Sequence, residues 1–320
     1  MSAPPPVRLG LVGCGRIAER GYLPAARGLA GVELAAVADP DAGRAGALAA
    51  ALGGVPRFAA AEPLLAAGGL DGLIVAAPAA EHAALAGLAA AAGLPSLVEK
   101  PPATDLRGAA RLAALEPAPA IGFNRRFLQG LELAPAVPDA GWLELDLELC
   151  FRRERWAAHA SRDEALLDAG IHLIDLALHL SGSAAIAVRA ASLAPERAEL
   201  ELELGRGRAR LRCRTDGRYA ERIEVRDRAG RTVAAARLDR VRAGAARLRG
   251  AREPLALSLR RQLEGFAATV RGGDGGPLAT AADGVAALAA VEAARRSATL
   301  GGAEVTVEPL AQGALAVELA

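Results

Sequence analysis

Lysine is almost absent from this chain: among 38 Lys and Arg residues, the only lysine is Lys100. Drift in a composition dominated by Ala, Gly, Arg and Leu would explain one stray survivor on the surface. The alternative is a position that arginine cannot fill, because lysine is a compact charge whose pKa falls on desolvation or beside another cation. The place of Lys100 in the fold decides between the two explanations.

Other features are also scarce, and each scarcity excludes a class of protein. The three cysteines, Cys14, Cys150 and Cys213, form neither a disulfide framework nor a metal-type cluster. A net charge of +1 argues against a nucleic-acid partner. No apolar run reaches the ~18 residues that a membrane span needs, and the start "MSAPPPVRLG" lacks the pattern of a secretion signal. We therefore expect a cytoplasmic protein without a metal or a membrane partner.

The length of 320 residues suits about two domains. In the first part, short apolar runs alternate with helical segments, which predicts a parallel sheet covered on both faces. The expected strands are 7–13, 32–39, 70–78, 95–100 and 119–123, and the expected helices lie within 14–31, 40–54, 80–93 and 105–115. This predicts an α/β domain with a doubly wound parallel sheet over residues 1–123 and a second domain over residues 124–320.

The turn after the first strand reads G-x-G-x-x-A, from Gly13 to Ala18. In this pattern the first glycine allows a tight turn, the second lets the backbone approach a pyrophosphate, and the small third residue permits close helix packing. Asp39 follows 21 residues after Ala18. In dinucleotide-binding folds, an acidic residue that binds the ribose lies about 20 residues after the glycine motif. A plain strand–helix turn with a capping aspartate is the alternative. The residues expected to bind a dinucleotide cofactor in this region are Gly13, Gly15, Arg16, Ile17 and Asp39.

The second strand ends on a carboxylate that bears on the choice of cofactor. Asp39 can accept hydrogen bonds from the adenosine ribose and would repel a 2′-phosphate, and Asp41 adds to that repulsion. Arg44 is the counter-argument, since a nearby arginine can hold the phosphate, although it also suits a helix surface. We expect NAD rather than NADP.

Lys100 lies at the C-terminal end of the predicted strand 95–100, directly after Glu99. In open α/β sheets, ligands bind in the crevice outside these strand ends. Pro101 and Pro102 stop the strand and fix its direction. This position at the strand end favours a functional role for Lys100 over an incidental lysine on the surface.

After Gly122 the pattern changes to alternation with period two, as in "WLELDLELCF". This predicts a mostly antiparallel sheet with one apolar face. The segment "AELELELGRGRARLRCRTDG" predicts a hairpin whose acidic arm faces a basic arm. The opposed residues are Glu199, Glu201 and Glu203 on one arm and Arg208, Arg210 and Arg212 on the other. Helices near 164–181, 256–272 and 280–299 are expected to cover the apolar face.

The 164–181 helix, "EALLDAGIHLIDLALHL", contains a second group of polar residues. Asp168 and His172 are spaced i, i+4, and Asp175 follows three residues later, so all three share one helical face. One interpretation is a core histidine held by a neighbouring carboxylate. The other is a general base, because histidine titrates near neutrality and a carboxylate both orients its ring and stabilises its charged form.

The motifs "GCGRIA", "ADPD", "AAPAAEH", "VEKP", "GFNRRF" and "LLDAGIHLIDL" occur in this order. The series resembles the glucose–fructose oxidoreductase / inositol dehydrogenase (Gfo/Idh/MocA) family over nearly the whole chain. The resemblance implies a Rossmann domain followed by a domain with a large open sheet. It also implies NAD(P)-dependent oxidation of a sugar or cyclitol hydroxyl, or reduction of the ketone.

The resemblance also assigns residues by position. Lys100, Asp168 and His172 correspond to a catalytic trio, Glu99 and Lys100 to contacts with the nicotinamide ribose, and Pro78 and His82 to a segment lining the cofactor. The candidates for substrate contacts are Asn124, Arg125, Trp156 and Asp175. A homodimer or homotetramer built through the open sheet is implied as well. The segments "LQGLELAPAVPDAGW" and "SRDEAL" depart from the family pattern beside the expected substrate pocket, so the family's substrates do not transfer.

Two other functions remain open at this point. One is a glycoside hydrolase of the same architecture, in which transient oxidation by NAD labilises the glycosidic bond. The other is a non-catalytic NAD(P)-binding protein.

Overall fold

The computed structural model describes residues 4–128, 141–153, 165–239 and 253–308. The chain forms two compact units, one made of Met1–Asn124 with Leu255–Gly284, the other of Arg125–Pro254 with Val285–Ala320. The division predicted after residue 123 lies one residue from the first of these boundaries. The return of residues 255–284 to the first unit has no counterpart in the prediction.

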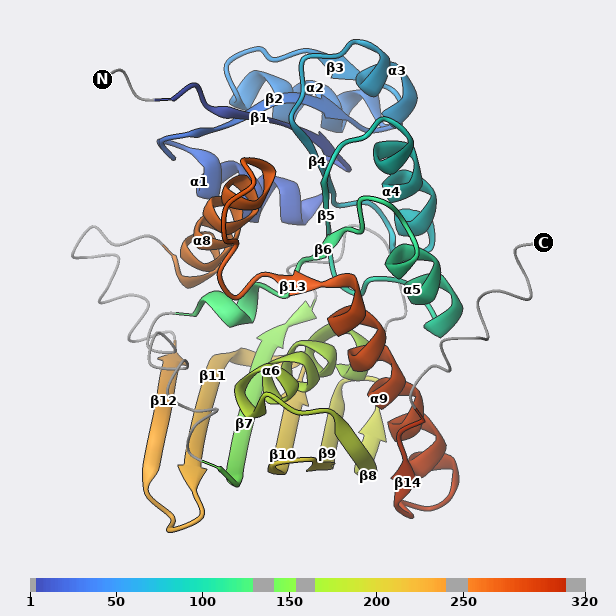
Figure 1. Ribbon diagram of the computed structural model, residues 1–320, viewed down its shortest axis with the longest axis vertical. Helices are drawn as coiled ribbons and strands as arrows, with labels where there is room; N and C mark the ends of the chain where they lie inside the picture. Colours follow the sequence, from blue (N-terminus) through green and yellow to red (C-terminus); the bar gives the residue numbers. More distant parts are fainter. Residues whose placement is uncertain (1–3, 129–140, 154–164, 240–252, 309–320) are drawn as a thin grey trace. The chain divides into compact units, whose positions relative to one another are not determined.

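The first unit is built on a seven-stranded sheet in the order β13-β6-β5-β4-β1-β2-β3 (Figure 1). All neighbours are parallel except β13, which pairs antiparallel with β6. This is the doubly wound arrangement that the sequence predicts. The strands are β1 (Val7–Val12), β2 (Val32–Ala38), β3 (Arg57–Phe58), β4 (Gly72–Val75), β5 (Ser96–Val98), β6 (Ala120–Ile121) and β13 (Ala279–Thr280).

Helices accompany the strands of this sheet and bury small apolar side chains, such as Ala45, Leu64, Ala86 and Ala109. They begin with a π-helical turn, Ala18–Tyr22, which runs into α1 (Leu23–Ala26). The others are α2 (Ala42–Ala51), α3 (Ala61–Ala66), α4 (His82–Ala91), α5 (Leu106–Ala113) and α8 (Pro254–Val270), with 3-10 turns at Ala79–Glu81 and Asn124–Phe127.

The position of α8 corrects one prediction. The helix expected near 256–272 was assigned to the second sheet, but Leu259, Leu263 and Phe266 belong to the core cluster that contains Leu9 and Ile74 of the first. The apolar spacing of this helix specifies that one face is buried. It carries no information about which sheet that face meets, because both sheets offer an apolar surface.

The second unit contains a seven-stranded sheet in the order β12-β11-β7-β10-β9-β8-β14. Its neighbours are antiparallel except for the parallel pair β7 and β10, which confirms the predicted, mostly antiparallel sheet. The strands are β7 (Leu143–Arg152), β8 (Ala185–Ala194), β9 (Arg197–Leu204), β10 (Gly207–Arg214), β11 (Asp216–Asp227), β12 (Thr232–Asp239) and β14 (Val305–Thr306).

One face of the second sheet is apolar and packs against helices. The helices α6 (Ile171–Ser181), which continues a π-helical turn at Leu166–Gly170, and α9 (Ala281–Thr299) lie across it (Figure 1). The alternation of buried leucine and exposed charge along β9 and β10 produces the two different faces.

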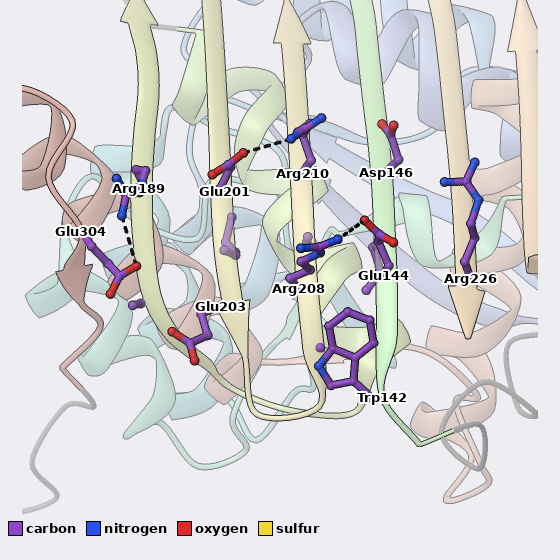
Figure 2. Close-up of a pocket in the computed structure, with 15 residues that line it drawn as sticks. Trp142, Glu144, Asp146, Arg189, Glu201, Glu203, Arg208, Arg210, Arg226 and Glu304 are labelled. Atoms are coloured by element: carbon purple, nitrogen blue, oxygen red, sulfur yellow. Dashed lines mark hydrogen bonds and ion pairs between the residues drawn. The ribbon is translucent and has the colours of Figure 1, made fainter. Parts of the chain in front are cut away.

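The opposite face of this sheet carries rows of charged side chains (Figure 2). The predicted hairpin register is confirmed, with Arg208, Arg210 and Arg212 opposite Glu203, Glu201 and Glu199. Arg210 forms an ion pair with Glu201 at 3.1 Å across the hairpin. Arg208 and Arg212 instead form ion pairs of 2.7 Å with Glu144 and Asp146 on β7. The acidic strand β7 therefore competes with β9 for the same arginines.

In the part of the chain that the structure describes, no helix is both long and apolar enough to cross a bilayer.

Candidate active site

The turn after β1 has the geometry of a dinucleotide-binding loop. Gly13 has a φ of +96°, and a Cβ there would lie 2.4 Å from the carbonyl oxygen of Ala76, so only glycine fits. Around Gly15 a Cβ would meet no atom within 4 Å, which leaves open space beside the backbone. Ala18 is fully buried where the helix meets the sheet. Each position therefore meets the requirement that the G-x-G-x-x-A pattern predicts, and the loop fits a pyrophosphate.

Asp39 lies directly beside this loop at the end of β2. Its carboxylate accepts hydrogen bonds of 2.8 Å from the backbone N–H groups of Cys14 and Asp41. Arg44 approaches from α2, 3.6 Å from Asp39 and 3.2 Å from Asp41. Burial, followed by the charge of Asp39, raises the pKa of the Cys14 thiol to about 12, so this cysteine stays protonated. The carboxylate is thus held at the loop, where an adenosine ribose is expected to bind.

The strand end at β5 holds Glu99 and Lys100 as expected. Glu99 is buried, and its backbone N–H continues the sheet with a 2.9 Å bond to Val75. Lys100 is partly exposed, and the Lys100–Pro101 peptide is cis. Gly122, directly after the neighbouring strand β6, leaves room for Glu99, because a Cβ there would lie 3.0 Å from the Glu99 Cα.

The structure buries His82, which was predicted to line the cofactor, among protein carbonyl groups. Its Nε2 lies 2.8 Å from the carbonyl oxygen of Ala77, and its Nδ1 lies 3.0 Å from that of Pro101 and 3.3 Å from that of Pro102. Burial lowers the pKa of His82, against the opposing effect of these carbonyls. Pro78, the other residue of this segment, immediately precedes the 3-10 turn that leads into α4.

The second unit holds Asp168 and His172 at the start of α6. Asp168 lies in the π-helical turn and accepts a 3.2 Å hydrogen bond from Nε of Arg153, and both of these side chains are about a quarter exposed. His172 is 6% exposed, one turn further along. π-Helical turns of this kind occur frequently at functional sites. No motif or spacing in the sequence indicated that Arg153 would be a partner of Asp168.

Two predicted substrate residues participate in buried ion pairs. Arg125 lies 3.1 Å from the buried Glu221, which also accepts a 2.9 Å bond from Tyr219. Burial raises the pKa of Glu221, while Arg125 opposes the shift.

Asp175 accepts two hydrogen bonds, of 3.0 and 2.6 Å, from Arg126. Asn124 in the first unit is buried and donates a 3.3 Å bond to Ser258. Trp156 lies outside the described residues. Sequence reasoning missed three buried residues that pair with distant parts of the chain: Arg126 with Asp175, Glu221 with Arg125, and Tyr22 with Glu99. Among the residues that the structure describes, no group of three His, Cys, Asp or Glu side chains is arranged to hold a metal ion.

The doubly wound sheet, the glycine loop and the acid at the end of β2 together define a dinucleotide-binding Rossmann domain. Residues 7–118 match the model of the Gfo/Idh/MocA family, described as an oxidoreductase family with an NAD-binding Rossmann fold. Over these residues the match confirms the resemblance found in the sequence: this part of the chain is an NAD-binding Rossmann domain of the Gfo/Idh/MocA type. A search of curated protein sequences gave no match.

Solved structures share the fold over nearly the whole chain. The myo-inositol dehydrogenase of Lactobacillus casei, in complex with NAD(H) and myo-inositol, has a TM-score of 0.77 at 18% identity, covering 97% of this chain and 99% of that one. The apo scyllo-inositol dehydrogenase of the same organism has a TM-score of 0.78 at 18% identity, covering 96% and 99%. The WlbA dehydrogenase of Bordetella pertussis, in complex with NADH and UDP-GlcNAcA, has a TM-score of 0.76 at 20% identity, covering 97% and 100%. At these identities the likeness establishes a shared fold.

Proposed function

We propose that the protein transfers hydride between NAD and a secondary hydroxyl or ketone of a sugar, a sugar derivative or a cyclitol. The observation that carries the proposal is the place of the single lysine, at the C-terminal end of a parallel strand in the NAD-binding unit, next to a buried glutamate. Ligands of open α/β sheets bind outside such strand ends. The solved structures of similar fold with bound myo-inositol or a nucleotide sugar support this substrate class.

In the proposed reaction, His172 takes the proton from the substrate hydroxyl, and Asp168 orients the imidazole and stabilises its charged form. Such a proton transfer typically contributes ~10²–10⁴-fold to the rate. Lys100 donates a hydrogen bond to the same oxygen and stabilises the negative charge that develops there. Bound NAD supplies the hydride acceptor. Asn124, Arg125, Trp156 and Asp175 remain proposed substrate-side residues, and the buried ion pairs of Arg125 and Asp175 suggest that these two shape the pocket through their partners.

A screen of NAD reduction across sugars, sugar acids, inositols and nucleotide sugars tests the proposal. We expect one of these classes to produce NADH in a one-to-one ratio with the oxidised product, detected by absorbance and product analysis. Cleavage of a glycoside without net NADH would identify the hydrolase instead. Tight NAD binding with no turnover on any of these compounds would identify a non-catalytic binding protein.

We also propose that a second copy of the chain binds to the charged face of the second sheet, as the family resemblance implies. Four adjacent strands, in the order β11, β7, β10 and β9, carry facing residues in register. The charges alternate in two of the three rows that cross these strands. These two rows are Arg226, Glu144, Arg208 and Glu203, and Arg222, Glu148, Arg212 and Glu199.

In both rows, residues at equal distances on either side of the line between β7 and β10 carry opposite charges, for example Glu144 and Arg208. A two-fold axis along that line brings each arginine of these rows opposite an acid of the second copy, as an isologous interface requires. The middle row consists of Glu224, Asp146, Arg210 and Glu201. Under the same axis, Arg210 of one copy faces Asp146 of the other, but Glu224 faces Glu201. Because each exposed ion pair contributes only about 0–1 kcal/mol and is screened by salt, we expect a weak, salt-sensitive association.

Sedimentation should show a larger mass at about 0.05 M salt than at about 0.5 M salt, where the Debye length is several-fold shorter. Two variants sharpen the test: Arg208→Glu with Arg212→Glu, and Glu144→Arg with Glu148→Arg. Each variant alone faces like charges across the axis and should be monomeric. An equimolar mixture should associate, because unlike charges then face each other. A mass that does not change with salt, or a mixture that stays monomeric, would contradict this interface.

A further inference from the structure

We propose that Tyr22 and His82 are positioning residues that fix the backbone on both sides of Lys100 and thereby direct its ammonium group. The inference rests on the proposed function in taking Lys100 as the group that meets the substrate oxygen. All the contacts that carry it lie within the first unit.

Tyr22 holds the chain immediately before Lys100. Its ring is fully buried in the π-helical turn after the glycine loop, and its hydroxyl donates a 2.8 Å hydrogen bond to Oε1 of Glu99. The other oxygen of this carboxylate, Oε2, accepts a 3.1 Å bond from the backbone N–H of Lys100. One carboxylate therefore connects the glycine-loop helix to the lysine backbone. Burial, followed by the charge of Glu99, raises the pKa of Tyr22, so the hydroxyl remains a donor.

His82 holds the chain immediately after Lys100. Its ring is 1% exposed and lies between the loop after β4 and the turn after β5. Nε2 faces the carbonyl oxygen of Ala77, while Nδ1 faces those of Pro101 and Pro102. Pro102 is itself packed, since a Cβ on Gly284 would lie 3.2 Å from its Cγ. Because the lowered pKa of His82 favours the neutral ring, only one of its nitrogens donates; with the proton on Nδ1 the ring hydrogen-bonds Pro101 after β5, while its other edge packs against the loop after β4.

These two connections restrain the backbone from which the lysine side chain extends. Lysine has a flexible four-carbon stem, so its direction depends on a fixed Cα and on the peptide planes at either side. A displacement of about 1 Å in a reacting group can cost about 10²-fold in rate. The buried hydrogen bonds at Glu99 and Pro101 restrain the backbone on either side of Lys100, and its flexible side chain extends from this fixed backbone.

The lone lysine makes this inference testable without a substrate. Reductive methylation with ¹³C-formaldehyde labels amines, so in this chain it marks Lys100 and the N-terminal amine. The ¹³C resonances of dimethyl-Lys100 then report its surroundings. In parallel, the rate of trinitrophenylation at Lys100, with and without NAD, reports its exposure by peptide mass spectrometry.

Four variants separate positioning from general stability. Tyr22→Phe removes one hydroxyl and keeps the ring. His82→Asn places an amide nitrogen near the position of Nδ1 and can still donate to Pro101, whereas His82→Gln places one near Nε2 and can donate only toward Ala77. Ser297→Ala is the control, because it removes a buried hydroxyl that bonds Ala190 and Ala303 in the second unit.

We expect Tyr22→Phe and His82→Gln to shift the Lys100 resonances toward those of free lysine and to reduce shielding by NAD at least about fivefold, as a loss of orientation predicts. His82→Asn and Ser297→Ala should resemble the parent protein. The inference would be overturned if Tyr22→Phe and His82→Gln gave the same resonances and labelling rates as the parent protein. It would also be overturned if both His82 variants lost shielding by NAD to the same extent. If NAD does not shield Lys100 in the parent protein, the proposed function fails, while the NAD-free resonances still test the positioning.

Discussion

Replacing Lys100 with arginine is expected to leave a folded protein that binds NAD and has lost most of its turnover. Arginine keeps the positive charge, but its planar fork is wider than an ammonium group and does not take the same place beside a reacting oxygen. Loss of one well-placed donor to developing negative charge typically costs about 10²–10³ in kcat. The measurements are kcat and the NAD dissociation constant, with the substrate that the screen identifies.

The reverse exchange at another site provides the control for Lys100→Arg. Arg111→Lys, on the exposed side of α5, should change neither kcat nor NAD affinity. If Lys100→Arg retained turnover within about threefold, far less than the loss of a donor predicts, the lone lysine would be a product of composition drift. The proposed mechanism would then lose its electrostatic component.

Replacing His172 with alanine is expected to abolish the pH-dependent limb of kcat/KM near neutrality. The imidazole is the proposed base, and its removal should lower the rate by ~10²–10⁴-fold. NAD affinity should stay unchanged, because His172 lies in the second unit while the loop that fits the pyrophosphate lies in the first. The pH–rate profile and a direct titration with NAD check the two expectations separately.

His179→Gln is the matched control for the histidine variant. It removes the imidazole two turns further along the same helix and should preserve the limb near neutrality. Added imidazole should restore part of the activity of His172→Ala, because a free base can enter the vacated space. A pH limb that persists in His172→Ala would identify a different group as the base.

The local signals in the sequence predicted much of the fold. Alternation of apolar runs with helices predicted the parallel sheet, and the period-two alternation in "AELELELGRGRARLRCRTDG" predicted the hairpin and its register. Both depend on side-chain periodicity, which is set by the geometry of a single strand or helix. The positive φ of Gly13 was predictable for the same reason, because it belongs to a single turn, whereas its close approach to Ala76 after β4 was not.

The contacts between distant segments could not be predicted. Tyr22 and Glu99 are 77 residues apart, and Arg126 and Asp175 are 49 apart. The amino-acid sequence shows that these residues are polar. Which of several acidic residues an arginine contacts depends on how whole helices and strands pack together. His82 illustrates the limit: nothing near it in the sequence indicated that its ring would lie among the carbonyl groups of Ala77, Pro101 and Pro102.

The return of α8 to the first unit makes the NAD-binding fold discontinuous along the gene. A fragment ending at residue 124 would lack Leu259, Leu263 and Phe266, which fill the core beside Leu9 and Ile74. Burial of such side chains contributes about 1.5–3 kcal/mol each, a large share of the net stability of a domain. Recombination that exchanges only the N-terminal segment between relatives would therefore separate a sheet from one of its own helices, and a working chimaera has to inherit both stretches from one parent.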